Sequence, residues 1–178
     1  MAIIGIVCVD NKWAIGKDNG LLFHLPTDMK FFKDHTMKHT VCMGENTLLS
    51  LPGSRPLKDR TNIVLCPEGH EYEGCICIHS FDDFITKVTE LSATSNVFII
   101  GGGMLYNSML PYYDRVLVTK VEADGNGTVF FPNLDENSEF KLISETPSIE
   151  DSGYKLKFTL YAKNNSVTED NSNMQFIG

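Results

Sequence analysis

Long apolar runs are absent from this sequence of 178 residues. A helix that crosses a membrane needs about 20 consecutive apolar residues, and no segment provides them. The N-terminal stretch MAIIGIVCVD is apolar, but it has no basic region and no cleavage signal. It therefore predicts a buried strand rather than a secretory signal.

An excess of positive charge is also absent. The chain has 15 Lys and Arg against 23 Asp and Glu, which gives a net charge of −8. Proteins that bind nucleic acid or an anionic membrane surface carry clustered basic residues, and this sequence has no such run. We therefore expect no nucleic-acid partner and no membrane partner.

Cysteine pairs are missing as well. No CxxC pair and no metal-ligand spacing occurs among the five cysteines, which are Cys8, Cys42, Cys66, Cys75 and Cys77. An odd number of cysteines without a targeting signal is typical of reduced thiols in the cytoplasm. The histidines add no metal-ligand spacing, so we predict no metal site and a cytoplasmic location.

What the sequence does contain is an alternation of strand and helix patterns. Short runs rich in Val and Ile predict buried strands at 2–9, 40–44, 61–66, 75–79, 97–101 and 115–123. Helical patterns fall at 26–36, 45–51, 80–92 and 104–110. This order is typical of a single α/β domain whose helices cover both faces of the sheet.

The C-terminal part has a different pattern. Two alternating runs at 139–146 and 154–162 are joined by a polar turn that contains Asp151, Ser152 and Gly153. This pattern predicts an antiparallel hairpin at the edge of the sheet. The remaining polar residues predict a domain at 1–163 followed by a tail at 164–178.

Asp28 lies among aromatic residues. On a helix, Asp28, Phe31, Phe32 and His35 share one face. Two interpretations stay open. An acid in the first turn of a helix often only complements the helix dipole. A charge on an apolar face is otherwise costly unless it has a partner, and a cationic or amidine-like ligand would be one.

Three further features have a functional and an ordinary interpretation. The stretch VFIIGGGMLY at 97–106 leads from a strand through three glycines into a helix, where a phosphate could approach the backbone. Tyr106 stands where the dinucleotide fingerprint has a small residue, so a tight turn without a ligand explains the glycines equally well.

The loop at 15–26 is either a mobile lid or an ordinary connection. Arg55 and Arg60 could grip a carboxylate or be solvated surface residues.

The order of several stretches carries more weight than any one of them. These stretches are IGKDNG, HLPTDMKFFK, VCMGENT, RPLKDRTNIVL, VFIIGGGMLY, VLVTKVEA and FFP. Between about residue 2 and about residue 163, the chain resembles dihydrofolate reductases of the bacterial type. The resemblance implies a mainly parallel, twisted sheet of eight strands with four flanking helices. It also implies that the chain acts as a monomer, transferring a hydride from NADPH to 7,8-dihydrofolate, with water as the source of the proton at N5.

The resemblance also assigns roles to individual residues. Asp28 would be the catalytic carboxylate that hydrogen-bonds the pterin, with Thr119 behind it. Arg60 would clamp the α-carboxylate of the substrate's glutamate tail. The other implied substrate-binding residues are Ile4, Met29, Phe32, Arg55, Leu57, Ile100 and Tyr106. The implied cofactor-binding residues are Ile6, Ala14, Ile15, Gly16, Asn19, Gly20, Leu21, Gly44, Asn46, Thr47, Cys66, Ile100, Gly101, Gly102, Gly103, Met104, Leu105 and Tyr106.

The sequence departs from the family's pattern at several positions. Leu22-Phe23 replaces the usual Pro-Trp, and Thr128 replaces a usual acid, so closure of the loop is affected. Glu45 stands where the family usually has a basic residue that helps to bind the 2′-phosphate of NADPH. We therefore predict weaker discrimination between NADPH and NADH than in typical relatives.

Two alternatives remain at this point. One is a reductase of the same fold that acts on a pyrimidine of riboflavin synthesis. The other is a non-catalytic protein that binds a pterin or a nucleotide. Asp28 and Arg60 favour the folate enzyme, which would also bind antifolates of the diaminopyrimidine type.

Overall fold

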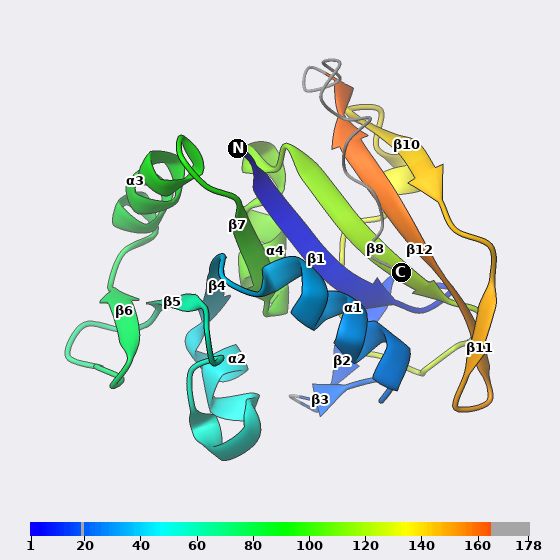
Figure 1. Ribbon diagram of the computed structural model, residues 1–178, viewed down its shortest axis with the longest axis horizontal. Helices are drawn as coiled ribbons and strands as arrows, with labels where there is room; N and C mark the ends of the chain where they lie inside the picture. The colour runs from blue at the N-terminus through cyan, green and yellow to red at the C-terminus, as the bar shows by residue number, and fades with distance from the viewer. Residues whose placement is uncertain (19, 165–178) are drawn as a thin grey trace.

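The computed structural model describes residues 1–18 and 20–164. The main sheet runs in the order β10-β12-β8-β1-β7-β4-β5-β6, and a short strand, β11, pairs with β12 beside this path (Figure 1). The strands are β1 (Ile3–Val9), β4 (Thr40–Gly44), β5 (Thr61–Leu65), β6 (Cys75–Ile78), β7 (Val97–Gly101), β8 (Arg115–Val121), β10 (Phe140–Glu145), β11 (Ile149–Asp151) and β12 (Tyr154–Lys163). All pairs from β8 to β6 are parallel, whereas β12 is antiparallel to its neighbours. The mainly parallel sheet with an antiparallel edge is therefore confirmed.

Four α-helices occupy the predicted segments. They are α1 (Pro26–Thr36), α2 (Glu45–Ser50), α3 (Phe81–Ser92) and α4 (Gly103–Ser108). Short 3-10 turns follow at Pro52–Ser54, Leu110–Tyr112 and Leu134–Glu136. In Figure 1, α1 lies in front of the sheet and α4 behind it, so helices cover both faces.

Each face of the sheet has its own core. Phe84 of α3 and Leu105 of α4 pack with Val7 and Val9 of β1 on one face. Phe31 of α1 and Leu48 of α2 pack with residues of β1, β4 and β7 on the other. Because side chains alternate along a strand, β1 contributes to both cores and is apolar throughout.

The C-terminal hairpin differs in detail from the prediction. The turn at Ser152-Gly153 joins β11 to β12, where Asp151 pairs with Tyr154. β10 pairs further along β12, from Phe140 to Glu145. Both turn residues have positive φ, 52° at Ser152 and 84° at Gly153, as tight hairpin turns require. A ten-residue strand thus pairs with two shorter ones in succession.

A second, small sheet was not predicted from the sequence. Its order is β3-β2-β9, with β2 at Ala14–Lys17, β3 at Gly20–Leu21 and β9 at Val129–Phe130. Strands of two to four residues carry too little alternation to be recognised as a pattern. The predicted tail at 164–178 lies outside the described residues, apart from Asn164. Among the helices described, none is both long and apolar enough to cross a membrane.

Candidate active site

Asp28 lies in the first turn of α1, close to the carboxyl end of β8. Pro26 starts the helix, where its lack of an N–H costs nothing, and Asp28 follows two residues later. The hydroxyl of Thr119, on β8, donates to Oδ1 of Asp28 at 2.6 Å. Thr119 itself is buried. The side chain that the helix pattern singled out is thus held against the sheet.

The surroundings of Asp28 oppose its ionisation in part. Burial raises the pKa of the Asp28 carboxyl, and hydrogen bonds from Thr119 and from the thiol of Cys8 act in the opposite direction. Cys8 and Thr119 are direct register partners on β1 and β8, so their side chains share one face. An ionised carboxylate has about four lone-pair sites, so these donors leave acceptor capacity for a cationic ligand.

Apolar side chains flank Asp28 on the same face of the sheet. Phe32, Leu57 and Ile100 are partly buried against the core beneath α1, and Met29 is 52% exposed. These four can contact a flat ring. Ile4 is 0% exposed, so its side chain lies inside the core and supports this surface from below.

The two arginines that the sequence singled out differ in their surroundings. Arg60 donates through Nε to the carbonyl of Lys58 at 2.9 Å and through Nη1 to Oγ1 of Thr36 at 3.1 Å. Thr36 ends α1, so Arg60 is fixed near the far end of the helix that carries Asp28. Burial lowers the pKa of Arg60, although a guanidinium stays charged. Arg55 is exposed.

Two strand-to-helix junctions meet beside this surface. β4 enters α2 at Gly44, and the neighbouring β7 enters α4 through Gly101, Gly102 and Gly103. A Cβ on Gly44 would lie 3.9 Å from the backbone nitrogen of Gly102. Gly101 has a φ of +123°, which L side chains rarely adopt. We call these four glycines, Gly44, Gly101, Gly102 and Gly103, the glycine cradle. Because they have no side chains, a dinucleotide could approach the backbone closely here.

The other predicted cofactor-binding residues differ in how exposed they are. Leu21 and Met104 are 83% and 89% exposed, and Asn46 is also exposed. Ala14, Ile6 and Leu105 are buried. Ile15, Gly16 and Gly20 belong to the small sheet, in which β2 pairs with β9. Asn19 lies outside the described residues.

Thr47 and Tyr106 support the glycine cradle from within. A Cβ on Gly102 would lie 3.4 Å from Oγ1 of Thr47. The hydroxyl of Tyr106 donates to the carbonyl of Ile6 at 2.7 Å, and Tyr106 is buried. Tyr106 therefore joins α4 to β1 and has its polar group satisfied without a ligand.

Glu45 has two polar partners at the start of α2. The hydroxyl of Tyr72 donates to its Oε1, and Nδ1 of His70 contacts the same oxygen at 2.5 Å. These hydrogen bonds lower the pKa of Glu45, that from Tyr72 most. His79 is likewise occupied, by Glu71 at 3.0 Å. Cys66 is 5% exposed, and its thiol donates to the carbonyl of His70 at 3.4 Å.

The replacements in the loop have specific contacts. Phe23 packs edge-on against Tyr154 of β12, with ring centroids 4.9 Å apart. The backbone N–H of Thr128 donates to the carbonyl of Gly16 at 2.9 Å. A backbone bond therefore joins these two loops at the position where the sequence lacks an acid.

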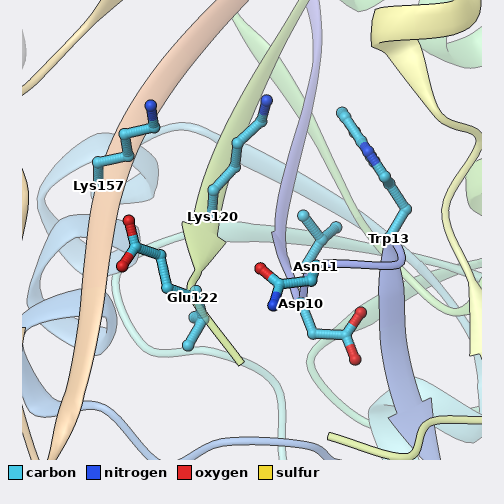
Figure 2. Close-up of a pocket in the computed structure, with 8 residues that line it drawn as sticks. Asp10, Asn11, Trp13, Lys120, Glu122 and Lys157 are labelled. Carbon is cyan, nitrogen blue, oxygen red and sulfur yellow. The ribbon is translucent and has the colours of Figure 1, made fainter. Parts of the chain in front are cut away.

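A cavity of about 230 Å³ lies between the ends of β1, β8 and β12 (Figure 2). Lys120 lines it and follows Thr119 on β8, so the two side chains point to opposite faces. Lys120 pairs with Asp135 at 3.0 Å, and Lys157 with Glu145 at 2.9 Å. Because both lysines already have carboxylate partners, we do not assign a substrate to this cavity. Its lining is Val9, Asp10, Asn11, Trp13, Lys120, Val121, Glu122 and Lys157.

The hydrogen-bond partners of the candidate residues had no signal in the sequence. Cys8 was noted only as an unpaired cysteine, and its contact with Asp28 depends on the register of β1 with β8. Tyr72 had no signal, since 27 residues separate it from Glu45. Within residues 1–18 and 20–164, no group of three or more His, Cys, Asp or Glu side chains could hold a metal ion. All five cysteines are free.

Comparisons with known proteins point to one family. The family model described as dihydrofolate reductase matches residues 2–163. A dihydrofolate reductase from Bacillus subtilis is 38% identical over 165 residues, which cover 90% of this chain and 94% of the relative. One from Haemophilus influenzae is 34% identical over 89% of this chain and 96% of the relative. A solved structure of the Enterococcus faecalis enzyme, complexed with NADP(H) and RAB-propyl, superposes with a TM-score of 0.82 at 28% identity, covering 92% and 96% of the two chains.

Proposed function

The chain belongs to the dihydrofolate reductase family, and we propose that Asp28 is the group on which it binds the pterin ring of its substrate. The protein is an NADPH-dependent oxidoreductase of one-carbon metabolism that converts 7,8-dihydrofolate to tetrahydrofolate. The observation that carries our proposal is the hydrogen bond from Thr119 to Asp28. It fixes one carboxylate oxygen and leaves acceptor sites for a ligand.

The surroundings of Asp28 favour a cationic ligand. A buried carboxylate with a raised pKa gains most from a partner that brings positive charge and N–H donors. The amino group and ring nitrogen of a protonated pterin provide both, in a two-pronged arrangement. Asp28 therefore stabilises the protonated substrate, and Thr119 orients the carboxylate that does so. Met29, Phe32, Leu57 and Ile100 supply the apolar contacts.

The glycines of the two junctions would hold the cofactor beside the Asp28 site. NADPH supplies the hydride when it is bound. Gly44, Gly101, Gly102 and Gly103 would let it approach the backbone, with Asn46 and Thr47 along its side. Leu21 and Met104, which are exposed, would cover its apolar parts.

The partners and location are extensions of this proposal. The family binds dihydrofolate, NADPH and antifolates, and we infer that diaminopyrimidines occupy the Asp28 site here. A net charge of −8 supports the absence of a nucleic-acid partner, and five free thiols support a cytoplasmic location. We further propose a monomer whose catalytic domain spans residues 1–163.

A spectrophotometric assay tests the function and the site together. Oxidation of NADPH on addition of dihydrofolate is expected for the wild-type chain. Asp28→Asn keeps the shape but loses a charge-assisted pair, a cost of about 1.5–3 kcal/mol per bond. This predicts a loss of about 10- to 100-fold in kcat/KM. Unchanged turnover in this variant at neutral pH would refute the role of Asp28.

Two measurements separate this function from the alternatives. The comparisons do not favour the reductase of riboflavin synthesis, and tight, competitive binding of a diaminopyrimidine would argue further against it, since only a pterin site should hold that ligand well. A chain that binds NADPH and dihydrofolate without oxidising the cofactor would be the non-catalytic carrier.

A further inference from the structure

Helix α1 begins without a capping side chain of its own. Its N-cap residue is Leu25, whose side chain has no hydrogen-bonding group. The backbone N–H and the hydroxyl of Thr27 instead donate to Oδ2 of Asp151, at 2.9 Å and 2.6 Å. Asp151 is the last residue of β11 and lies 124 positions further along the chain. The first turn of α1 is therefore capped by a residue of β11.

We propose that Asp151 is a positioning residue for Asp28: it anchors the first turn of α1 and so fixes the substrate-binding carboxylate against β8. The inference rests on the proposed role of Asp28. Thr27, which Asp151 binds, is the residue directly before Asp28 in the chain. A shift of this turn would move Asp28 relative to Thr119, whose hydroxyl lies 2.6 Å away.

A second residue of the β11–β12 hairpin also contacts α1. Phe158 of β12 stacks on Phe31 of α1, with ring centroids 4.1 Å apart and an interplanar angle of 5°. Phe158 is also the register partner of Thr119 on β8. Figure 1 shows the hairpin beside the N-terminal end of α1. Asp151 and Phe158 together therefore join α1 to the hairpin, and β12 of this hairpin pairs with the strand that carries Thr119.

The charge of Asp151 acts on Asp28 as well. Hydrogen bonds from Thr27, then from Ser152, hold the pKa of Asp151 below its usual value, aided by the nearby charge of His24. Asp151 therefore stays ionised at neutral pH, and its charge adds to the burial that raises the pKa of Asp28. Thr119 and Cys8 oppose this rise in the pKa of Asp28, and Asp151 reinforces it. Burial raises the pKa of the Tyr106 phenol, and the charge of Asp28 raises it further. Removing the charge of Asp151 should lower the pKa of Asp28.

The chain offers a matched control for capping alone. Ser80 caps α3 by accepting from the backbone N–H of Asp83 at 3.2 Å. α3 packs in the core on the face of the sheet opposite to α1. Loss of either cap should destabilise the protein by a similar amount. Only loss of the Asp151 side chain should also change the titration of Asp28 and the binding of dihydrofolate.

The experiment compares Asp151→Asn, Asp151→Ala and Ser80→Ala in the full chain. Three quantities are measured: the thermal midpoint, the KM for dihydrofolate, and the titration of the Asp28 carboxyl carbon by NMR in the free protein. Asp151→Asn keeps an acceptor for Thr27 and should lower the pKa of Asp28 with little change in the midpoint. Asp151→Ala should lower that pKa too and raise KM about three- to tenfold, while kcat changes less. Ser80→Ala should lower the midpoint only.

Two results would overturn the inference. One is an Asp151→Ala protein that loses stability as Ser80→Ala does but keeps the wild-type KM and the wild-type titration of Asp28. The other is an Asp151→Asn protein in which Asp28 titrates as in the wild type. Inactivity of the wild-type chain would refute the proposed function instead, and the NMR titration would still test the link between Asp151 and Asp28.

Discussion

Cys8 and Thr119 are register partners on adjacent parallel strands, and both donate to the carboxylate of Asp28. The thiol is a weaker donor than the hydroxyl, but it stabilises the same ionised form. Burial, followed by the charge of Asp28, raises the pKa of the Cys8 thiol, so it remains a protonated donor. The ionisation of Asp28 therefore depends on two strands as well as on its own helix.

Replacing Cys8 should change how Asp28 titrates. Cys8→Ala removes one donor to the ionised carboxylate and should raise the pKa of Asp28 further. The pH below which a diaminopyrimidine loses affinity should rise with it. Cys8→Ser, which keeps a donor, should behave like the wild type. Equal titration of Asp28 in the alanine and wild-type proteins would contradict the contact.

Asp28 should lower the stability of the ligand-free protein at neutral pH. Its pKa is raised by folding, so the folded state binds the proton more tightly than the unfolded state. Stability then falls as pH rises from the ordinary pKa through the raised one, and it stays reduced above that. Asp28→Asn should unfold at a higher temperature than the wild type at neutral pH, and the two midpoints should converge in acid. Thermal unfolding at several pH values measures this, and a lower midpoint for Asn at neutral pH would argue against it.

Glu45 should weaken the preference for NADPH over NADH. Its pKa is lowered by Tyr72 and His70, so it is ionised at neutral pH and would repel a nearby 2′-phosphate. We expect the ratio of kcat/KM for the two cofactors to be below about a thousandfold. Glu45→Arg should raise this ratio about tenfold or more. Glu68 is an exposed acid in the loop after β5, and Glu68→Arg should leave the ratio unchanged. A wild-type preference above that limit would refute the prediction.

Arg60 should contribute to binding only for ligands that have a glutamate tail. Arg60→Gln loses a charge-assisted contact and should raise the KM for dihydrofolate about tenfold or more. Affinity for a diaminopyrimidine without a carboxylate should be unchanged. Arg55→Gln, at an exposed position, serves as the comparison. If Arg60→Gln weakens both ligands equally, its bond to Thr36 serves only to support α1.

The helices and the parallel strands could be predicted because each has a local pattern. Buried strands such as β7 are continuous apolar runs, and α1 shows a clear face and a proline at its start. The proposed role of Asp28 came from the resemblance to a family, since spacing alone favoured a simple helix-dipole acid. In the structure, Asp28 lies in the first turn of α1 and also accepts a hydrogen bond from Thr119 of β8.

What could not be predicted depends on residues brought together across the chain. The bond between Thr27 and Asp151 spans 124 positions, and the sequence marked Asp151 only as part of a polar turn. The contact of Cys8 with Asp28 requires knowing that β1 pairs with β8 in one register. The partners of Glu45 lie in the loop after β5, which carries no periodic pattern.

The place of β1 in the sheet has a consequence for biosynthesis. β1 is translated well before its two neighbours, β7 and β8, which begin only at Val97 and Arg115. Both hydrogen-bonding edges of an apolar strand therefore stay unpaired until β7 has been translated, and the edge that faces β8 stays unpaired for longer. Contacts so distant in sequence close slowly, so nascent chains of this protein should rely on chaperones to cover that segment.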